Sequence, residues 1–167
     1  MKIIFLDIDG VLISTRSVLA RLDETCTRPD YQIADSIQCV DPVAVGLVNR
    51  ICRKADVRIV ISSSHRTHFA NLHSLRLYIA ELGITGEVIG STPVLNKARG
   101  FEIQSWLETW EEETGSNSTV YIIVDDIADM LPEQKCNFIK CDPNTAFSAK
   151  NYYDACRILG ITESNII

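Results

Sequence analysis

Two aspartates stand one residue apart at the end of an apolar run near the start of the sequence. Residues 3–13 read IIFLDIDGVLI, in which Asp7 and Asp9 are followed by Gly10. An Asp-Gly pair alone is a common turn, but the unbroken apolar run before it is typical of a strand buried on both faces of a parallel sheet. We therefore expect the two carboxylates at the carboxyl end of a central strand, where open α/β sheets bind ligands.

Two later apolar runs also end in polar residues. The run VRIVI at residues 57–61 is followed by SSSHR, and VYIIV at 120–124 is followed by Asp125 and Asp126, with Asp129 one helical turn further on. Because the carboxyl ends of parallel strands share one edge of the sheet, we expect all three sets of side chains to converge on a single pocket.

The residue types in this pocket favour a divalent cation and a phosphoryl group. Clustered carboxylates repel one another unless a cation neutralises them. Oxygen donors without a His or Cys set favour a hard ion, and Mg²⁺ suits a site of one or two carboxylates plus a substrate phosphate. Serine hydroxyls with a nearby cation, here Lys97 or Arg99, are what phosphoryl oxygens need.

The elements that must position these residues follow from an alternation of apolar runs with segments of helical period. This alternation predicts an α/β fold of three layers, a Rossmann-like parallel sheet with helices on both faces. The first, second and fourth runs are the most apolar and should be central. Strands are expected at residues 3–6, 57–61, 87–89, 120–124 and 137–140.

Helix signals lie between the expected strands. Asp41 can cap a helix that starts at Pro42, and a second helix should follow Thr67 and stop at Gly83. Two more are expected at about residues 100–113 and 148–159. In the former, Trp106 and Trp110 share an apolar face and should be core residues rather than a surface for stacking bases.

The whole chain, residues 1–167, is expected to form a single domain, because its length and 46% apolar content suit one core. Residues 14–40 fit neither helix nor strand pattern and are expected to be a short flap over the strand ends. They leave no room for a large cap.

Charge and cysteine content narrow the class of protein further. A net charge of −6 gives no general attraction to nucleic acid or anionic membranes. No apolar run reaches membrane length, and the acidic start does not resemble a signal peptide, so a cytoplasmic location is expected. The six cysteines show no C-x-x-C spacing and should be reduced and mostly buried.

The motifs together resemble a known family. LDIDGVL, VRIVISSS, the basic residues before the third helix, and YIIVDDIAD are similar, in that order, to the four motifs of the haloacid dehalogenase (HAD) superfamily of aspartate-dependent phosphatases. More narrowly, VISSSHR, RGFEIQSWL and YIIVDDIADM resemble the small-cap branch formed by the HAD domain of Swiss-army-knife RNA repair proteins. In that branch Trp is usual at the position of His65.

The resemblance implies a phosphoric monoester hydrolase with an aspartyl-phosphate intermediate. Asp7 would be the nucleophile, and Asp9 would protonate the leaving oxygen and later deprotonate water. An alkoxide needs that proton whereas a halide does not, so Asp9 argues for a phosphatase rather than a dehalogenase. Mg²⁺ would be held by the Asp7 carboxylate, the Asp9 carbonyl and an acid of the Asp125-Asp126 pair.

The same resemblance implies the residues that contact the phosphoryl group. Ser62 is the first choice for the hydroxyl and Ser63 the second, and Arg99 is preferred over Lys97 as the cation. The candidate substrate contacts are Ser63, Gly10, His65 and Arg66.

The expected substrate is a phosphorylated small molecule or a nucleic-acid end. An open site could admit a bulky ester, and four arginines could surround its mouth: Arg16, Arg21, Arg28 and Arg66. Two alternatives belong to other classes of protein. The chain could be a catalytically silent HAD-like binding module, or a phospho-receiver, although receivers place the acidic pair on the first strand and the phosphorylated Asp on a later one.

Overall fold

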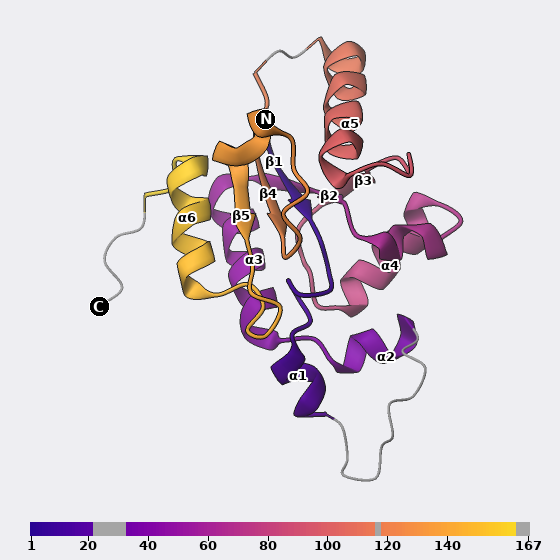
Figure 1. Cartoon of the computed structure of the whole chain (residues 1–167), viewed down its shortest axis with the longest axis vertical. Coiled ribbons are helices and arrows are strands. Elements are labelled where there is room, and N and C mark those ends of the chain that lie inside the picture. The colour runs from indigo at the N-terminus through magenta and orange to yellow at the C-terminus, as the bar shows by residue number, and fades with distance from the viewer. Residues whose placement is uncertain (22–32, 116–117, 163–167) are drawn as a thin grey trace.

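A five-stranded parallel sheet with helices on both faces forms the centre of the molecule in the computed structural model (Figure 1), which describes residues 1–21, 33–115 and 118–162. The strand order is β3-β2-β1-β4-β5. The strands are β1 (Lys2–Leu6), β2 (Val57–Ile61), β3 (Val88–Ser91), β4 (Val120–Asp125) and β5 (Phe138–Lys140). The predicted fold class is thus confirmed, and the three most apolar runs are the central strands.

The register of the central strands aligns the residues that follow them. Leu6 pairs with Ile61 of β2 on one side and with Val124 of β4 on the other. The next residue of each strand is Asp7, Ser62 or Asp125, so these three side chains start at the same level of the sheet.

The two faces of the sheet carry separate hydrophobic cores because successive strand residues point to opposite sides. Ile4 and Leu6 pack toward one face, and Ile3 and Phe5 toward the other. The first face is covered by α3 (Pro42–Ala55), α4 (Leu72–Glu81) and α6 (Ala149–Leu159). The second face is covered by α5 (Arg99–Thr114), beside the 3-10 helix η2 (Pro132–Asn137).

The helix boundaries follow local capping chemistry. Asp41 accepts hydrogen bonds from two backbone N–H groups of α3, and Pro42 occupies its first turn, as predicted. Ser148 caps α6 in the same way. Gly115 and Gly160 end α5 and α6 in the left-handed conformation that favours glycine.

The helix expected directly after Thr67 begins later. Residues Ser64–His68 form a 3-10 helix, η1, and α4 starts only at Leu72. The reason is a better cap, because the Asn71 side chain accepts a hydrogen bond from the Ser74 N–H, three residues on.

Residues 14–40 are partly helical where the structure describes them. They contain α1 (Thr15–Leu19) and α2 (Ile33–Gln38), whereas residues 22–32 lie outside the described part. Both helices lie on the side of the sheet where the strands end (Figure 1). A bridge between Ile13 and Val40 joins the two ends of the segment.

Several smaller predictions can be compared with the structure. Trp106 packs edge-on against Phe5 and is partly buried against the core of the second face, whereas Trp110 stacks on Trp106 but belongs to neither described core cluster, so the prediction that both are core residues is only partly confirmed. The five described cysteines are free, and all except Cys136 are buried, while Cys26 lies outside the described residues. Among the described helices, none combines the length and apolar composition needed to cross a bilayer.

Candidate active site

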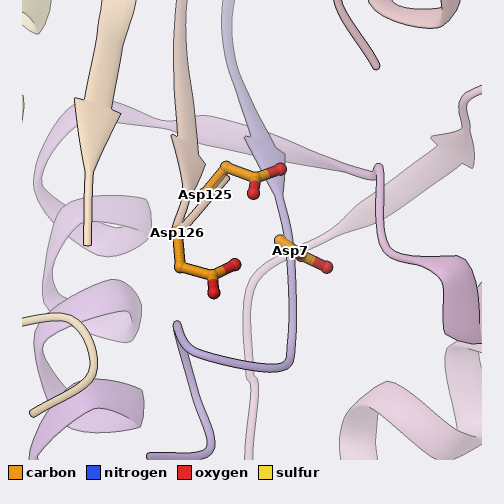
Figure 2. Close-up of side chains that lie close together, drawn as sticks. All are labelled: Asp7, Asp125 and Asp126. Atoms are coloured by element: carbon orange, nitrogen blue, oxygen red, sulfur yellow. The ribbon is translucent and has the colours of Figure 1, made fainter. Parts of the chain in front are cut away.

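Three carboxylates from neighbouring strands meet at the carboxyl edge of the sheet. Asp7 follows β1, Asp125 ends β4 and Asp126 comes next, and Figure 2 shows that their side chains lie close together. One oxygen from each carboxylate lies within 4.8 Å of the other two. Asp7 and Asp125 are buried and Asp126 is partly exposed. The structure thus brings together three of the four acids that the sequence predicts as metal ligands.

Backbone hydrogen bonds fix one oxygen of each buried acid. The Ile8 N–H donates to Asp7 Oδ1 at 2.8 Å, and the Ile127 N–H donates to Asp125 Oδ1 at 2.9 Å. The other oxygen of Asp125, Oδ2, is buried and accepts no well-aligned hydrogen bond among the described residues, although the Arg99 guanidinium lies close to it. A buried polar atom of this kind is costly unless a further group satisfies it.

Burial and mutual repulsion make full ionisation of this cluster unfavourable. Burial, with the nearby Asp7 charge, raises the pKa of Asp125 to about 7. Burial, followed by Asp7, also raises the pKa of Asp126. A bound cation would favour the charged carboxylates and reverse these shifts.

Arg99 is the cation that the structure places beside the cluster. Its Nη1 atom lies 3.1 Å from Asp7 Oδ2 and 2.9 Å from Asp125 Oδ2. Burial alone would lower the pKa of Arg99, but the nearby carboxylates of Asp7, Asp125 and Asp129 act in the opposite direction and the net shift is upward. Lys97 is exposed, with its ammonium 5.7 Å from the ring centre of Phe101. Of the two predicted cations, therefore, it is Arg99 that contacts the acids.

The donor set fits Mg²⁺. A magnesium ion holds oxygens at about 2.1 Å, so ligands on opposite sides are about 4.2 Å apart. The three carboxylate oxygens are close to that span, and Asp125 Oδ2, which faces Arg99 but accepts no well-aligned hydrogen bond among the described residues, could serve as one of the ligands. The Asp9 carboxylate is directed elsewhere, so only its carbonyl is a candidate for this ion.

The Asp9 side chain contacts His65 instead. Asp9 Oδ2 lies 2.9 Å from Nε2 of His65, a buried residue of η1. On the other side of the ring, Nδ1 lies 2.7 Å from the Tyr78 hydroxyl, which lies 2.7 Å from Oγ of Ser36. Sequence reasoning identified His65 but not Tyr78 or Ser36. A tyrosine on the apolar face of a helix was the available signal, since a buried phenol needs a partner.

The two predicted serines differ in their surroundings. Ser62 Oγ is buried and lacks a hydrogen-bond partner in the described part of the chain. Ser63 Oγ accepts the His65 N–H at 3.3 Å and so caps η1. Thr92, which follows β3 as Ser62 follows β2, also has a buried hydroxyl with no described partner and was missed by sequence analysis. Ser62 and Thr92 thus offer unsatisfied hydroxyls near the strand ends.

Arg66 is not available as the substrate contact that the sequence suggested. Its side chain is buried, and its guanidinium donates to the backbone carbonyls of Ser62 and Ser63, to those of Thr92 and Pro93, and to the Glu102 carboxylate. These contacts use all five N–H donors of an arginine. Arg66 therefore joins the ends of β2 and β3 to α5.

Glu102 was not singled out by sequence analysis. It lies in α5, where Gly100 and Ile103 are also buried. Its carboxylate also accepts a hydrogen bond from the Leu95 N–H. An acidic residue on the apolar face of a helix was the signal, because a buried carboxylate needs a charged partner.

The predicted ring of arginines is only partly found. Arg16 forms an ion pair with Asp41 at 2.8 Å, and Arg66 is buried. Arg21 is exposed, and Arg28 lies outside the described residues. Fewer of these arginines are therefore available to line the site than the sequence suggested. The argument from local charge for a polyanionic substrate is correspondingly weaker.

A protein-family model matches most of the chain. Residues 3–152 match the family described as the HAD domain in Swiss Army Knife RNA repair proteins. The matched range includes every motif and site residue discussed above. No curated protein and no solved structure matches the chain significantly.

Proposed function

This chain belongs to the family of HAD domains in Swiss Army Knife RNA repair proteins, and from that membership we propose that it is a Mg²⁺-dependent phosphatase. It would hydrolyse phosphate monoesters through an aspartyl-phosphate on Asp7. The observation that carries this proposal is the convergence of Asp7, Asp125 and Asp126 around one point, with Arg99 paired to two of them.

In the first step an Asp7 carboxylate oxygen attacks phosphorus, and the bond from phosphorus to the ester oxygen breaks. Asp9 donates its proton to that leaving oxygen, so the product departs as an alcohol. The Arg99 guanidinium and the Ser62 hydroxyl are the groups that would stabilise charge on the phosphoryl oxygens.

In the second step Asp9, now a carboxylate, takes a proton from water while the water oxygen attacks phosphorus. The bond from phosphorus to Asp7 breaks, inorganic phosphate leaves, and both aspartates return to their starting states. Mg²⁺, held by Asp7, Asp125 or Asp126 and the Asp9 carbonyl, would neutralise the acids and draw charge from the phosphoryl group.

The proposed substrate is a nucleotide or the phosphorylated end of a nucleic acid. The description of the family as part of RNA repair proteins supports this class. A site at the carboxyl edge of the sheet, with only short helices in the described part of residues 14–40, would suit a large ester better than a site under a full cap domain.

A panel of esters tests the proposal. Oligonucleotides with 3′- or 5′-phosphates, nucleoside monophosphates and sugar phosphates are each incubated with the protein, in Mg²⁺ or in EDTA, and phosphate release is measured. We expect release only with Mg²⁺ and preferentially from the oligonucleotides or nucleotides. Clear preference for sugar phosphates would contradict the substrate class alone, and no release from any ester would favour the silent binding module.

The nucleophile is tested by Asp7→Asn, which keeps an oxygen to accept the Ile8 N–H. We expect kcat to fall by on the order of 10⁴-fold or more, with unchanged folding by circular dichroism. Glu111→Gln, which neutralises an exposed acid on α5, is the matched control and should retain activity. Retained activity in Asp7→Asn would remove Asp7 as the nucleophile.

A further inference from the structure

We propose that His65 is a positioning residue that holds the Asp9 carboxyl in the orientation from which it serves the leaving oxygen. This inference rests on the proposed function, because it assigns a task within that reaction. It concerns one contact, 2.9 Å long, between His65 Nε2 and Asp9 Oδ2.

The two partners differ sharply in exposure. The Asp9 side chain is 52% exposed, whereas that of His65 is 6% exposed. A half-exposed aspartate on a turn can adopt several rotamers, and a general acid acts only from within hydrogen-bond reach of its target. The buried ring is the fixed partner, so His65 restricts Asp9 rather than the reverse.

The ring of His65 is itself fixed from behind. Its Nδ1 atom lies 2.7 Å from the Tyr78 hydroxyl, and that hydroxyl lies 2.7 Å from Ser36 Oγ. Burial raises the pKa of Tyr78 to about 12, so this hydroxyl keeps its proton. The Tyr78 ring is held in turn by stacking on Phe69, 4.9 Å away between ring centres.

This arrangement runs from the core to the catalytic turn without a break. Ser36 lies in α2, Tyr78 in α4, His65 in η1 and Asp9 after β1, so four separate segments determine where one carboxyl lies. Catalytic groups held by such supporting hydrogen bonds lose rate when the support is removed, even though the supporting residue never touches the substrate.

Two substitutions of His65 separate the two sides of its ring. Glutamine can place its amide nitrogen near the position of Nε2 and so keep the contact with Asp9. Asparagine is shorter and can replace only Nδ1, which faces Tyr78. We expect His65→Asn to lose the Asp9 contact and His65→Gln to retain most of it. His68→Ala, an exposed histidine of the same 3-10 helix, is the matched control.

The readout is kcat/KM for two esters that differ in their need for a proton. Nitrophenolate leaves without much protonation, whereas the alkoxide of glycerol phosphate requires it. A correctly placed general acid contributes roughly 10²–10⁴-fold, so we expect His65→Asn to lose on the order of 10–100-fold on glycerol phosphate and only a few-fold on p-nitrophenyl phosphate. The kcat/KM of His65→Gln should be closer to that of the wild type, and the kcat/KM of His68→Ala should equal the wild-type value for both esters.

Tyr78→Phe provides a second variant that keeps the ring and its stacking. It removes one hydrogen bond to His65, and we expect a loss of about 2- to 10-fold on glycerol phosphate, again with little change on p-nitrophenyl phosphate. A crystal structure of His65→Asn should show the Asp9 carboxyl displaced from its wild-type position.

The outcomes distinguish this proposal from the proposed function. Equal losses on both esters, or an Asp9 rotamer unchanged in His65→Asn, would overturn the role of His65 while the phosphatase stands. A wild-type protein inactive on every ester would contradict the proposed function, and the role of His65 in that reaction with it.

Discussion

A β-carbon on Gly10 would lie 2.5 Å from Cγ of Asp126, so the turn after β1 and the acidic end of β4 touch only because residue 10 has no side chain. Gly10 also has a φ of +71°, in the left-handed region. The sequence analysis named Gly10 as a candidate substrate contact, and the structure places it against Asp126, a candidate metal ligand.

This contact predicts that Gly10→Ala displaces the Asp126 carboxylate. We expect Mg²⁺ affinity, measured by calorimetry, to fall at least about 10-fold, in the range seen when support for a metal ligand is lost. A left-handed backbone costs an alanine roughly 1–2 kcal/mol. The free energy of unfolding should fall by more than this, because the new β-carbon also meets the Asp126 side chain.

Gly115→Ala is the control that isolates the backbone cost. Gly115 has a φ of +65°, and a β-carbon there would meet no atom within 4 Å. It should lose stability by roughly 1–2 kcal/mol and keep wild-type Mg²⁺ affinity. Equal behaviour of the two variants would show that the approach of Gly10 to Asp126 is not a constraint.

The two basic residues before α5 should differ in their effect on activity. Arg99→Ala leaves Asp7 and Asp125 without their paired cation, and we expect kcat/KM to fall by about 10²–10³-fold, as when one electrostatic stabiliser is removed. Lys97→Ala removes a cation that lies over the Phe101 ring and should change kcat/KM by less than about 3-fold. Phosphate release by both variants, measured side by side, decides between them, and a larger loss in Lys97→Ala would reverse the assignment.

The raised pKa of Asp125 gives the metal-free protein a defined pH dependence. Its folded-state pKa is about 7, against an ordinary value of 3.8, so between these values the folded state binds more protons than the unfolded state. The free energy of unfolding in EDTA should therefore decrease as the pH rises from about 4 to about 7. Urea titrations across this range measure it, and Asp125→Asn should flatten the slope.

Mg²⁺ should show the opposite trend, because it binds the ionised carboxylates. We expect the apparent affinity for Mg²⁺ to increase with pH up to about 7 and then to level off. The increase in melting temperature caused by Mg²⁺ should then be largest near the pH at which the metal-free protein is least stable. An affinity independent of pH between 5 and 8 would mean that no protonated carboxylate competes with the ion.

The sequence predicted those parts of the site that depend on strand ends. Unbroken apolar runs identified the central strands, and the parallel register then required Asp7, Ser62 and Asp125 to lie at one level. The placement of His65 and Arg66 could not be predicted, because their partners are a tyrosine, a glutamate and backbone carbonyls that are distant in the sequence. Such contacts are set by packing between segments, which periodicity does not reveal.

The contacts of Arg66 predict that even a conservative change there is damaging. Lysine has three donors where arginine has five, so Arg66→Lys must leave at least two of the five acceptors unpaired in a buried region. At about 1–3 kcal/mol for each unsatisfied group, we expect urea unfolding to show a loss of roughly 2–6 kcal/mol. Two of those acceptors are the carbonyls of Ser62 and Ser63, so kcat/KM should fall as well. Arg53→Lys, on the exposed side of α3, should stay within about 0.5 kcal/mol of wild type. An Arg66→Lys protein as stable as that control would show that the five hydrogen bonds do not hold the strand ends in place.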